Sequence, residues 1–152
     1  MTWQQGRAEV VDALRARRLQ RVTGGQAAGE GWLEVARRRL ASAHRYGADD
    51  PESAYILAYD AARHALVGVL AQQGLRGTTE GGHLVLEHVT RAQFGDAFIE
   101  YSTLRRRRAE LEYPAFPGEK IDIDELDAAI ASAGRIIDGA QQLLTHLTIF
   151  ND

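Results

Sequence analysis

The chain has 152 residues, a length that suits one domain with a substantial core. Apolar residues make up 45% of it and charged residues 26%, as is usual for a globular protein, and the absence of cysteine excludes disulfides and thiolate chemistry. The formal net charge of -3 argues against a protein whose whole surface binds nucleic acid, but it is compatible with a local basic site.

The sequence shows no segment of the kind that a membrane or an export signal requires. No apolar run approaches the roughly 18 residues of a membrane-spanning helix. Residues 1–7 lack the apolar core of a signal peptide. We therefore expect a cytoplasmic protein that has no membrane partner.

Residues 1–30 are predicted to form an N-terminal helix and a glycine-rich linker. The helix is expected over Glu9–Val22, and four arginines gather near its C-terminal end: Arg15, Arg17, Arg18 and Arg21. The helix dipole explains this clustering sufficiently, although the same arginines also suit an arm that binds a partner. Thr23–Gly31 contains four glycines and is predicted to be flexible.

Residues 31–152 are predicted to form an all-α, up-down bundle of about five core helices. Proline and glycine separate its helices, and no stretch alternates like a half-buried strand. After a helix over Trp32–Tyr46, Asp50 is the expected N-cap and Pro51 the first residue of the next helix. That next helix, Glu52–Gln73, is apolar on almost all sides, which predicts that it is central.

The segment Gly74–Gly82 is glycine-rich but lacks the spacing of a phosphate-binding loop, so we expect a flexible connector. A shorter helix follows over His83–Gln93. Two histidines of this region, His83 and His88, are five residues apart and diverge by about 140° on a helix. They do not form a metal site, and no other cluster has the spacing of metal ligands. We expect neither a metal nor a cofactor.

The last two helices have recognisable ends. One begins at an expected N-cap, Asp96, and ends before the proline-containing segment Pro114–Gly118. The final helix begins at Asp122 or Asp124, and its apolar residues repeat at helical spacing as far as Leu147.

The helix after Asp96 carries four consecutive arginines, Arg105–Arg108. A helix advances about 100° per residue, so several apolar residues share one buried face: Tyr101, Leu104 and Leu111. Arg108 falls in the middle of this face and Arg105 near its edge. A guanidinium in such a place must be paired or must serve a purpose.

The opposite side of the arginine run is predicted to face water: Arg106, Arg107 and Glu110. Glu112 follows Arg108 by one turn on the buried side. This pair has two interpretations. It is either an Arg–Glu ion pair that ties the bundle together or, with Arg105, a positive pocket that grips phosphate through bidentate contacts.

Asp60 and His64 lie one turn apart on the central helix. A carboxylate beside an imidazole can orient a general base. The sequence offers no nucleophile for such a base, so a supporting polar pair in a helix interface is the simpler interpretation. Tyr55 and Tyr59 are spaced for packing and are most simply core residues.

The segment Ala54–Leu66, AYILAYDAARHAL, resembles the Ala/Tyr-rich helix of HEPN domains, the higher eukaryote and prokaryote nucleotide-binding family. Further elements follow in the family's order: Leu70–Gly74, the His-bearing Gly82–Leu84, and the Arg-led motif Arg105–Tyr113. A long amphipathic last helix completes the pattern. The match extends from about Trp32 to Leu147.

The resemblance implies a helical up-down bundle that forms a homodimer. Many HEPN proteins are metal-independent endoribonucleases with a motif arginine followed by a histidine, and two copies meet across the dimer. Others are inactive or substrate-binding partners of nucleotidyltransferases, as in toxin–antitoxin systems. Here Arg108 aligns with the motif arginine, but Tyr113 replaces the histidine. Arg108, Glu112 and Tyr113 resemble the family's variant Arg-x-x-x-[Asp/Glu]-Tyr.

Three functional hypotheses follow. The first is a catalytically degenerate HEPN protein of a toxin–antitoxin or phage-defence module, which binds RNA or nucleotide phosphate through Arg105 and Arg108. The second is a metal-independent endoribonuclease with Arg108, Glu112 and Tyr113 as catalytic residues, in which clustered arginines stabilise the phosphorane. A phenol, with a pKa near 10, is a poor general base for this reaction. The third is a purely structural bundle.

The resemblance also gives Tyr113 a separate role. In HEPN proteins with a nucleotidyltransferase partner, the motif tyrosine can accept a nucleotide. Tyr113 is therefore the predicted acceptor, if such a partner accompanies this protein.

Overall fold

The computed structural model describes residues 3–79 and 82–152, with only the backbone of Gly82 and His83. Within these ranges the chain forms six α-helices, two 3₁₀ helices and a two-stranded sheet. It is an all-α helical bundle, as predicted. No helix of the described part has the length and apolar character needed to span a membrane.

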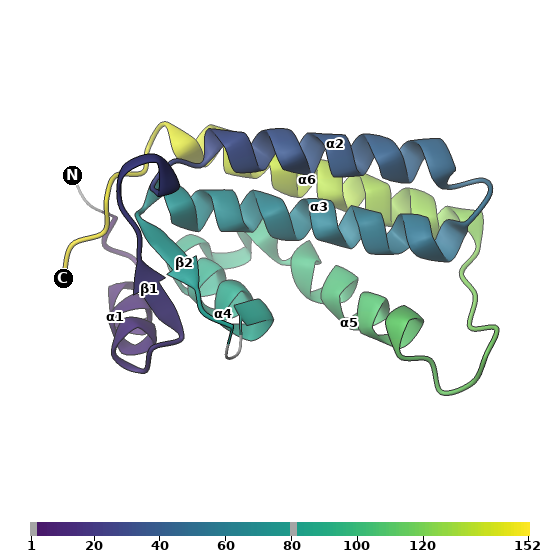
Figure 1. Ribbon diagram of the computed structural model, residues 1–152, viewed down its shortest axis with the longest axis horizontal. Coiled ribbons are helices and arrows are strands. Elements are labelled where there is room, and N and C mark those ends of the chain that lie inside the picture. The colour runs from purple at the N-terminus through teal and green to yellow at the C-terminus, as the bar shows by residue number, and fades with distance from the viewer. Residues whose placement is uncertain (1–2, 80–81) are drawn as a thin grey trace.

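The long helices α2 (Glu30–Tyr46), α3 (Pro51–Gln72) and α6 (Ile123–Leu144) lie side by side (Figure 1). Chain direction reverses from α2 to α3, again to α5 (Glu100–Glu112), and again to α6, which gives the up-down order. The remaining long helix, α4 (Gly82–Phe94), packs beneath the C-terminal end of α3.

The central position of α3 follows from its composition, because alanine and other apolar residues cover most of its circumference. Its start is as predicted. The Asp50 carboxylate accepts hydrogen bonds from the Ser53 backbone N at 3.2 Å and the Ser53 hydroxyl at 2.6 Å, which lower the pKa of Asp50, and Pro51 is the first helical residue. At its other end, a Cβ on Gly29 would lie 2.4 Å from the Gly68 carbonyl oxygen, so glycine lets α2 and α3 approach closely there.

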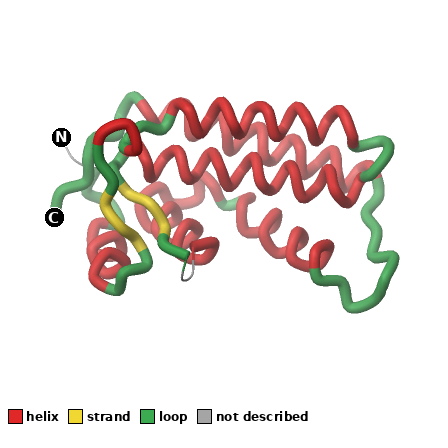
Figure 2. The backbone as a smooth tube through the Cα atoms, viewed as in Figure 1, coloured by secondary structure: helices red, strands yellow, loops and turns green. Residues whose placement is uncertain are grey.

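The bundle also contains a small two-stranded sheet that the sequence did not indicate. Strand β1 (Leu19–Arg21) pairs antiparallel with β2 (Leu75–Gly77), and Gln20 lies opposite Arg76 (Figure 2). The alternation that indicates a strand needs about four to eight residues, and these strands have three each. The predicted connector Gly74–Gly82 therefore contributes a strand.

The first helix, α1 (Arg7–Arg15), is shorter than the predicted Glu9–Val22 at its C-terminal end. It closes with backbone hydrogen bonds from Arg17 N to Leu14 O and from Arg18 N to Ala13 O, while Arg17 adopts a left-handed φ of 59°. Only Arg15 of the four clustered arginines lies in the last helical turn. The helix dipole therefore does not explain the other three.

The segment Thr23–Gly31, predicted as a flexible linker, is anchored to the bundle. It contains a 3₁₀ helix over Gly24–Gln26, and the Gly29 N–H donates to Gln72 Oε1 at 2.9 Å. Just before it, the Val22 N–H donates to the Gly74 carbonyl at 2.8 Å. Helix α1 packs against α4, and its Val10 and Ala13 belong to the common core.

The region around α5 differs from the prediction at its start. A 3₁₀ helix over Gly95–Phe98 precedes α5, which begins at Glu100 without a side-chain cap, so Asp96 is not its N-cap. Asp122 is the N-cap of α6 and accepts from the Glu125 N–H at 2.8 Å, one of the two predicted starts. Helix α6 ends at Leu144 rather than Leu147, although Leu147 is buried.

Candidate functional site

Arg108 points into the bundle, as its helical phase predicts. Its Cζ lies 5.3 Å from the centre of the Tyr59 ring on α3, a cation–π contact. It also forms an ion pair with Glu112, so the predicted Arg–Glu pair is present. Its Nε is buried and has no hydrogen-bond partner among the described residues.

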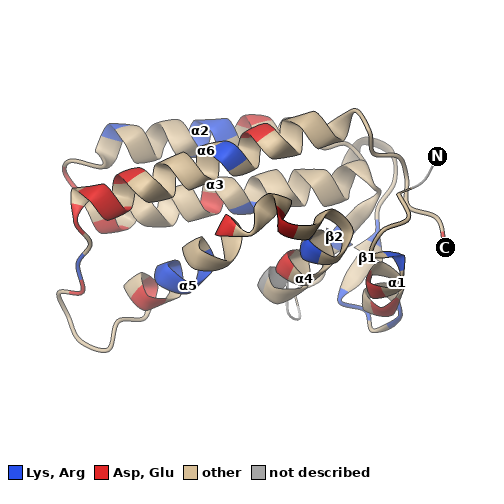
Figure 3. Cartoon of the chain, turned by 180° about the vertical axis from the view of Figure 1, so that it is seen from behind, with Lys and Arg blue, Asp and Glu red and all other residues tan. Residues whose placement is uncertain are grey.

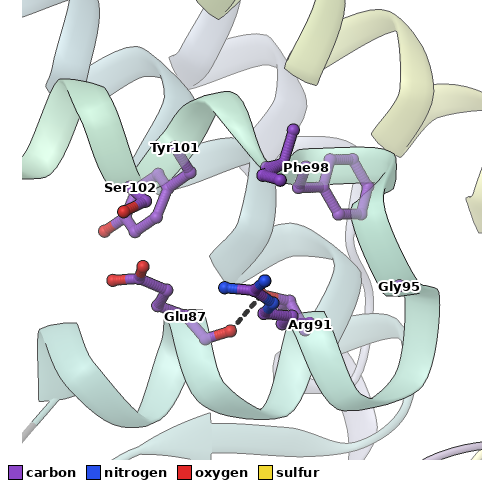
Figure 4. A pocket seen from close by; sticks show the side chains of 8 residues that line it. Glu87, Arg91, Gly95, Phe98, Tyr101 and Ser102 are labelled. Carbon is purple, nitrogen blue, oxygen red and sulfur yellow. Dashed lines mark hydrogen bonds between the residues drawn. The ribbon is translucent and has the colours of Figure 1, made fainter.

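Arg105 connects α5 to α4. Its Nε donates to Glu87 Oε2 at 2.5 Å, and both side chains are partly buried. Figure 4 shows Glu87 on α4 pointing toward Tyr101 and Ser102 of α5, at the edge of a cavity of about 20 Å³. A volume of this size holds about one water molecule, so the cavity is too small for a substrate. Glu87 is a site residue that the sequence did not indicate, because its role depends on the approach of two helices.

Two buried tyrosines lie next to these arginines. The hydroxyls of Tyr59 and Tyr101 are 3.1 Å apart and hydrogen-bonded, and their rings stack with centres 5.6 Å apart. Burial raises the pKa of both phenols, although the positive charge of Arg63 opposes the shift. Both tyrosines therefore keep their protons near neutral pH, and neither is a general base.

Arg107 does not point to water, contrary to the prediction. Its side chain is 19% exposed. It donates to a set of acceptors: Glu110 Oε2 at 2.7 Å, Glu119 Oε1 at 2.8 Å, Glu125 Oε1 at 2.7 Å and the Lys120 carbonyl at 3.1 Å. These acceptors raise the pKa of the guanidinium. The loop after α5 and the start of α6 supply most of these acceptors. The helical phase of α5 alone does not predict contacts with other segments.

The remaining residues of the run are at the surface. Arg106 is exposed and has no ion pair among the described residues, as predicted. Tyr113 follows the last residue of α5 and is 77% exposed. The structure therefore brings Arg108 and Glu112 together and leaves the Tyr113 phenol in solvent.

The contacts of Asp60 and His64 fit a polar pair in a helix interface better than an oriented general base. His64 Nδ1 donates to the backbone carbonyl of Asp60 at 2.7 Å, while the Asp60 carboxylate oxygen lies 3.9 Å away. That carboxylate accepts hydrogen bonds from Arg63 at 3.1 and 3.2 Å. The imidazole instead stacks on Trp32, with ring centres 5.7 Å apart. The polar residues support the α2–α3 interface, and the geometry gives no oriented general base.

Among the described side chains of residues 3–79 and 84–152, no group of three or more His, Asp or Glu is arranged to hold a metal ion. The side chain of His83 lies outside the described residues, so the expected divergence of His83 and His88 is untested. No family model, curated protein or solved structure matches this chain. The HEPN assignment therefore stays a prediction, and the functional argument depends on the geometry of the site.

Proposed function

We propose that this protein binds the phosphate groups of RNA or of a nucleotide through Arg105 and Arg108 and is catalytically degenerate. The observation that supports the proposal is the state of the two guanidiniums. They lie one turn apart on α5, each is oriented by one carboxylate, and each is partly exposed. A guanidinium has five N–H donors in a planar fork that suits phosphate.

Both guanidiniums retain donors for a ligand. Arg105 uses Nε toward Glu87, and Arg108 uses Nη2 toward Glu112. Among the described residues, no acceptor is hydrogen-bonded to the remaining nitrogens of either side chain. Because the two glutamates compensate the positive charge, a phosphate must either displace one of them or bind beside it. Removal of the Glu112 charge should therefore strengthen binding.

The surroundings favour binding over RNA cleavage. Tyr59 and Tyr101, the two tyrosines beside the arginines, keep their protons near neutral pH. Among the described residues, Arg108 contacts Glu112 and the ring of Tyr59, and neither is an imidazole. Efficient general-base catalysis needs a group whose pKa lies near the working pH.

The assembly and the partner in this proposal rest on the resemblance to HEPN domains. The proposed assembly is a homodimer. The proposed partner is a nucleotidyltransferase of a toxin–antitoxin or phage-defence module. The exposure of Tyr113 supports its role as a nucleotide acceptor, because a transferase can reach its hydroxyl. The intact mass of the protein after incubation with the transferase and nucleotide tests this role, and the addition should disappear in Tyr113→Phe.

The arginine run itself supplies a matched control for phosphate binding. We expect Arg105→Ala and Arg108→Ala each to weaken binding of a fluorescently labelled RNA several-fold and to lower the salt dependence by about one phosphate contact. Arg106→Ala removes the same charge from the same helix at an exposed position and should change binding little. Glu112→Gln should strengthen binding.

Three results would change this interpretation. Equal effects of all three alanine variants would mean that Arg105 and Arg108 act only through net charge. Absence of RNA and nucleotide binding by the wild type, together with unfolding of Arg108→Ala, would favour a structural ion pair. Cleavage of the RNA in EDTA that is lost in Arg108→Ala would establish an endoribonuclease instead.

A further inference from the structure

The ribbon formed by β1 and β2 carries cations that are not neutralised within the described part of the chain. Arg17 and Arg18 are exposed in the turn that leads into β1, and Arg76 is exposed on β2. None of the three has an ion pair with a described carboxylate. We call them the ribbon arginines. No described carboxylate compensates their charge, unlike that of Arg105, Arg107 and Arg108.

Arg76 is also held in a defined orientation. With the oxygen of its side-chain amide turned toward the guanidinium, Gln20 accepts from Arg76 Nε at 2.9 Å and from Nη2 at 2.8 Å. The two residues are directly opposite in the register of the ribbon. Because Gln20 is neutral, this contact positions Arg76 without cancelling its charge.

Arg76 lines an open groove of about 420 Å³ at the C-terminal end of α3. Other residues around it come from α2, α3 and α4 and from the position after β2: Trp32, Arg63, Val67, Leu86 and Thr78. A second groove of about 240 Å³ shares Trp32, Val67 and Arg76 with the first, so the two adjoin. Volumes of this size are typical of small-molecule sites.

Trp32 provides an aromatic surface in both grooves. It is 37% exposed, although it is one of the largest apolar side chains of the protein. Its indole stacks on the buried His64, which restrains its orientation. Gly68 allows this placement, since a Cβ there would lie 3.0 Å from Trp32 Cβ. An indole that is half-exposed and restrained is a ready stacking partner for a nucleobase.

The backbone of the turn that carries Arg17 and Arg18 is bonded to a residue of the same groove. Thr78, which lines the groove, donates from Oγ1 to the Arg17 carbonyl at 2.8 Å and from its N–H to the Arg18 carbonyl at 2.9 Å. The turn that carries Arg17 and Arg18 is thus attached to the groove wall. Arg63, by contrast, is paired with Asp60 and adds less positive charge.

From this arrangement we propose that the groove binds a nucleotide unit, with the base stacked on Trp32 and the phosphate bound by Arg76. The unit belongs either to a free mononucleotide or to a single strand whose neighbouring phosphates face Arg17 and Arg18. Stacking platforms combined with a basic groove are the general means of binding single strands. The site uses neither Arg105 nor Arg108, so it goes beyond the function proposed above.

Tryptophan fluorescence tests this site directly. The chain has two tryptophans, so Trp3→Phe leaves Trp32 as the only indole. Titration of this variant with AMP and with a twelve-residue oligoadenylate RNA should quench Trp32, whereas ribose 5-phosphate, which lacks a base, should not. Quenching by both ligands indicates a nucleotide site, and quenching by the oligonucleotide alone indicates a site for single strands. If neither ligand quenches, the proposal is wrong.

Variants separate this site from the one on α5. Trp32→Leu should weaken oligonucleotide binding roughly ten-fold, since stacking of one base is lost, while Trp32→Phe should retain most of the affinity. Arg76→Gln should weaken it several-fold and reduce the salt dependence. The exposed Arg38→Ala, on the outside of α2, is the charge-matched control and should have little effect.

The two proposals fail independently. The fluorescence titration should be unchanged in Arg105→Ala and Arg108→Ala. Circular dichroism shows whether Trp32→Leu still folds. If it does not, Arg76→Gln decides, because this exposed strand residue contributes little to the core. Unchanged binding by Arg76→Gln would overturn the assignment of the phosphate to Arg76, and Trp32→Phe binding as weakly as Trp32→Leu would overturn stacking.

Discussion

The arginines of α5 and those of the β1–β2 ribbon differ in what surrounds them. On α5, three of the four consecutive arginines contact carboxylates, and Arg107 alone contacts three. The ribbon arginines have no described acidic partner, and Arg76 is oriented by the neutral Gln20. Figure 3 shows where the charged residues lie along the chain, with basic segments of α5 between acidic ones and a basic turn between α1 and β1.

This contrast teaches that a run of like charges in a sequence does not identify the surface whose positive charge is least compensated in the fold. Folding neutralises the run on α5 with glutamates from α4, α5, α6 and the loop before α6. The same process leaves the shorter cluster Arg17–Arg18 and the isolated Arg76 without compensation among the described residues. We therefore expect mutation of Arg107 on α5 to lower stability most, and mutations on the ribbon to change binding with little effect on stability.

The largest stability effect is expected for Arg107→Ala. It removes the partner of three glutamates at once and releases the loop between α5 and α6, whose Lys120 carbonyl accepts from Arg107. Loss of several charge-assisted hydrogen bonds in a partly exposed network costs about 2 to 3 kcal/mol, whereas surface substitutions usually cost less than about 0.5 kcal/mol. Urea denaturation measures this difference, with the exposed Arg106→Ala as the matched control. Equal stabilities of the two variants would contradict the structural role of Arg107.

Alkaline pH tests the same side of the bundle without removing an arginine. Burial, together with the negative charge of Glu125, raises the pKa of Tyr55 to about 12, compared with about 10 for an unfolded tyrosine. The folded state thus keeps a proton that the unfolded state loses. Stability is fully present below pH 10 and declines above it, by on the order of 2 kcal/mol at pH 12 from Tyr55 alone.

Urea denaturation between pH 8 and 12 measures this decline. Tyr55→Phe should flatten the profile, because phenylalanine does not ionise, whereas the exposed Tyr113→Phe should leave it unchanged. A profile of Tyr55→Phe as steep as that of the wild type would show that Tyr55 is not the group responsible.

A double-mutant cycle compares the best-defined contact of each region. Removal of Arg105 and Glu87, singly and together, should give a coupling energy of about 1 kcal/mol, because the pair is charged and partly buried. The same cycle for Arg76 and Gln20 should give less, since one member is neutral and both are exposed. A larger coupling energy on the ribbon would reverse the comparison between the two regions.

The helical part of the fold was predictable because its signals are local. The caps Asp50 and Asp122 and the apolar repeat of α3 and α6 act within a few turns of the chain. The phase of the arginine run likewise placed Arg108 correctly on the buried side of α5. These features depend on residues that are close together in the sequence, so the sequence pattern alone predicts them.

What the sequence did not predict depends on distant partners. The ribbon pairs two segments of three residues from different parts of the chain, and neither segment is a recognisable strand alone. Arg107 is covered by the loop after α5, whose Glu119 accepts a hydrogen bond from it. The sequence places Tyr59 and Tyr101 in the core but does not predict the hydrogen bond between their hydroxyls. The sequence also does not predict that Trp32 is exposed, because a tryptophan in the first turn of a helix can equally be buried.

The smallest expected effect concerns the turn that carries the ribbon arginines, and it has the opposite sign. Arg17 has a φ of 59°, a conformation that glycine adopts without steric cost at the end of a helix. Arg17→Gly should therefore leave stability unchanged or raise it by up to about 1 kcal/mol. The same variant should weaken binding of a single-stranded RNA, since one uncompensated charge is lost.

Arg17→Ala separates the two effects, because it removes the charge and retains the unfavourable backbone conformation. If Arg17→Gly destabilised the protein as much as Arg107→Ala, the side chain of Arg17 would have a structural role, and the distinction between the carboxylate-paired arginines of α5 and the unpaired arginines of the ribbon would not predict stability.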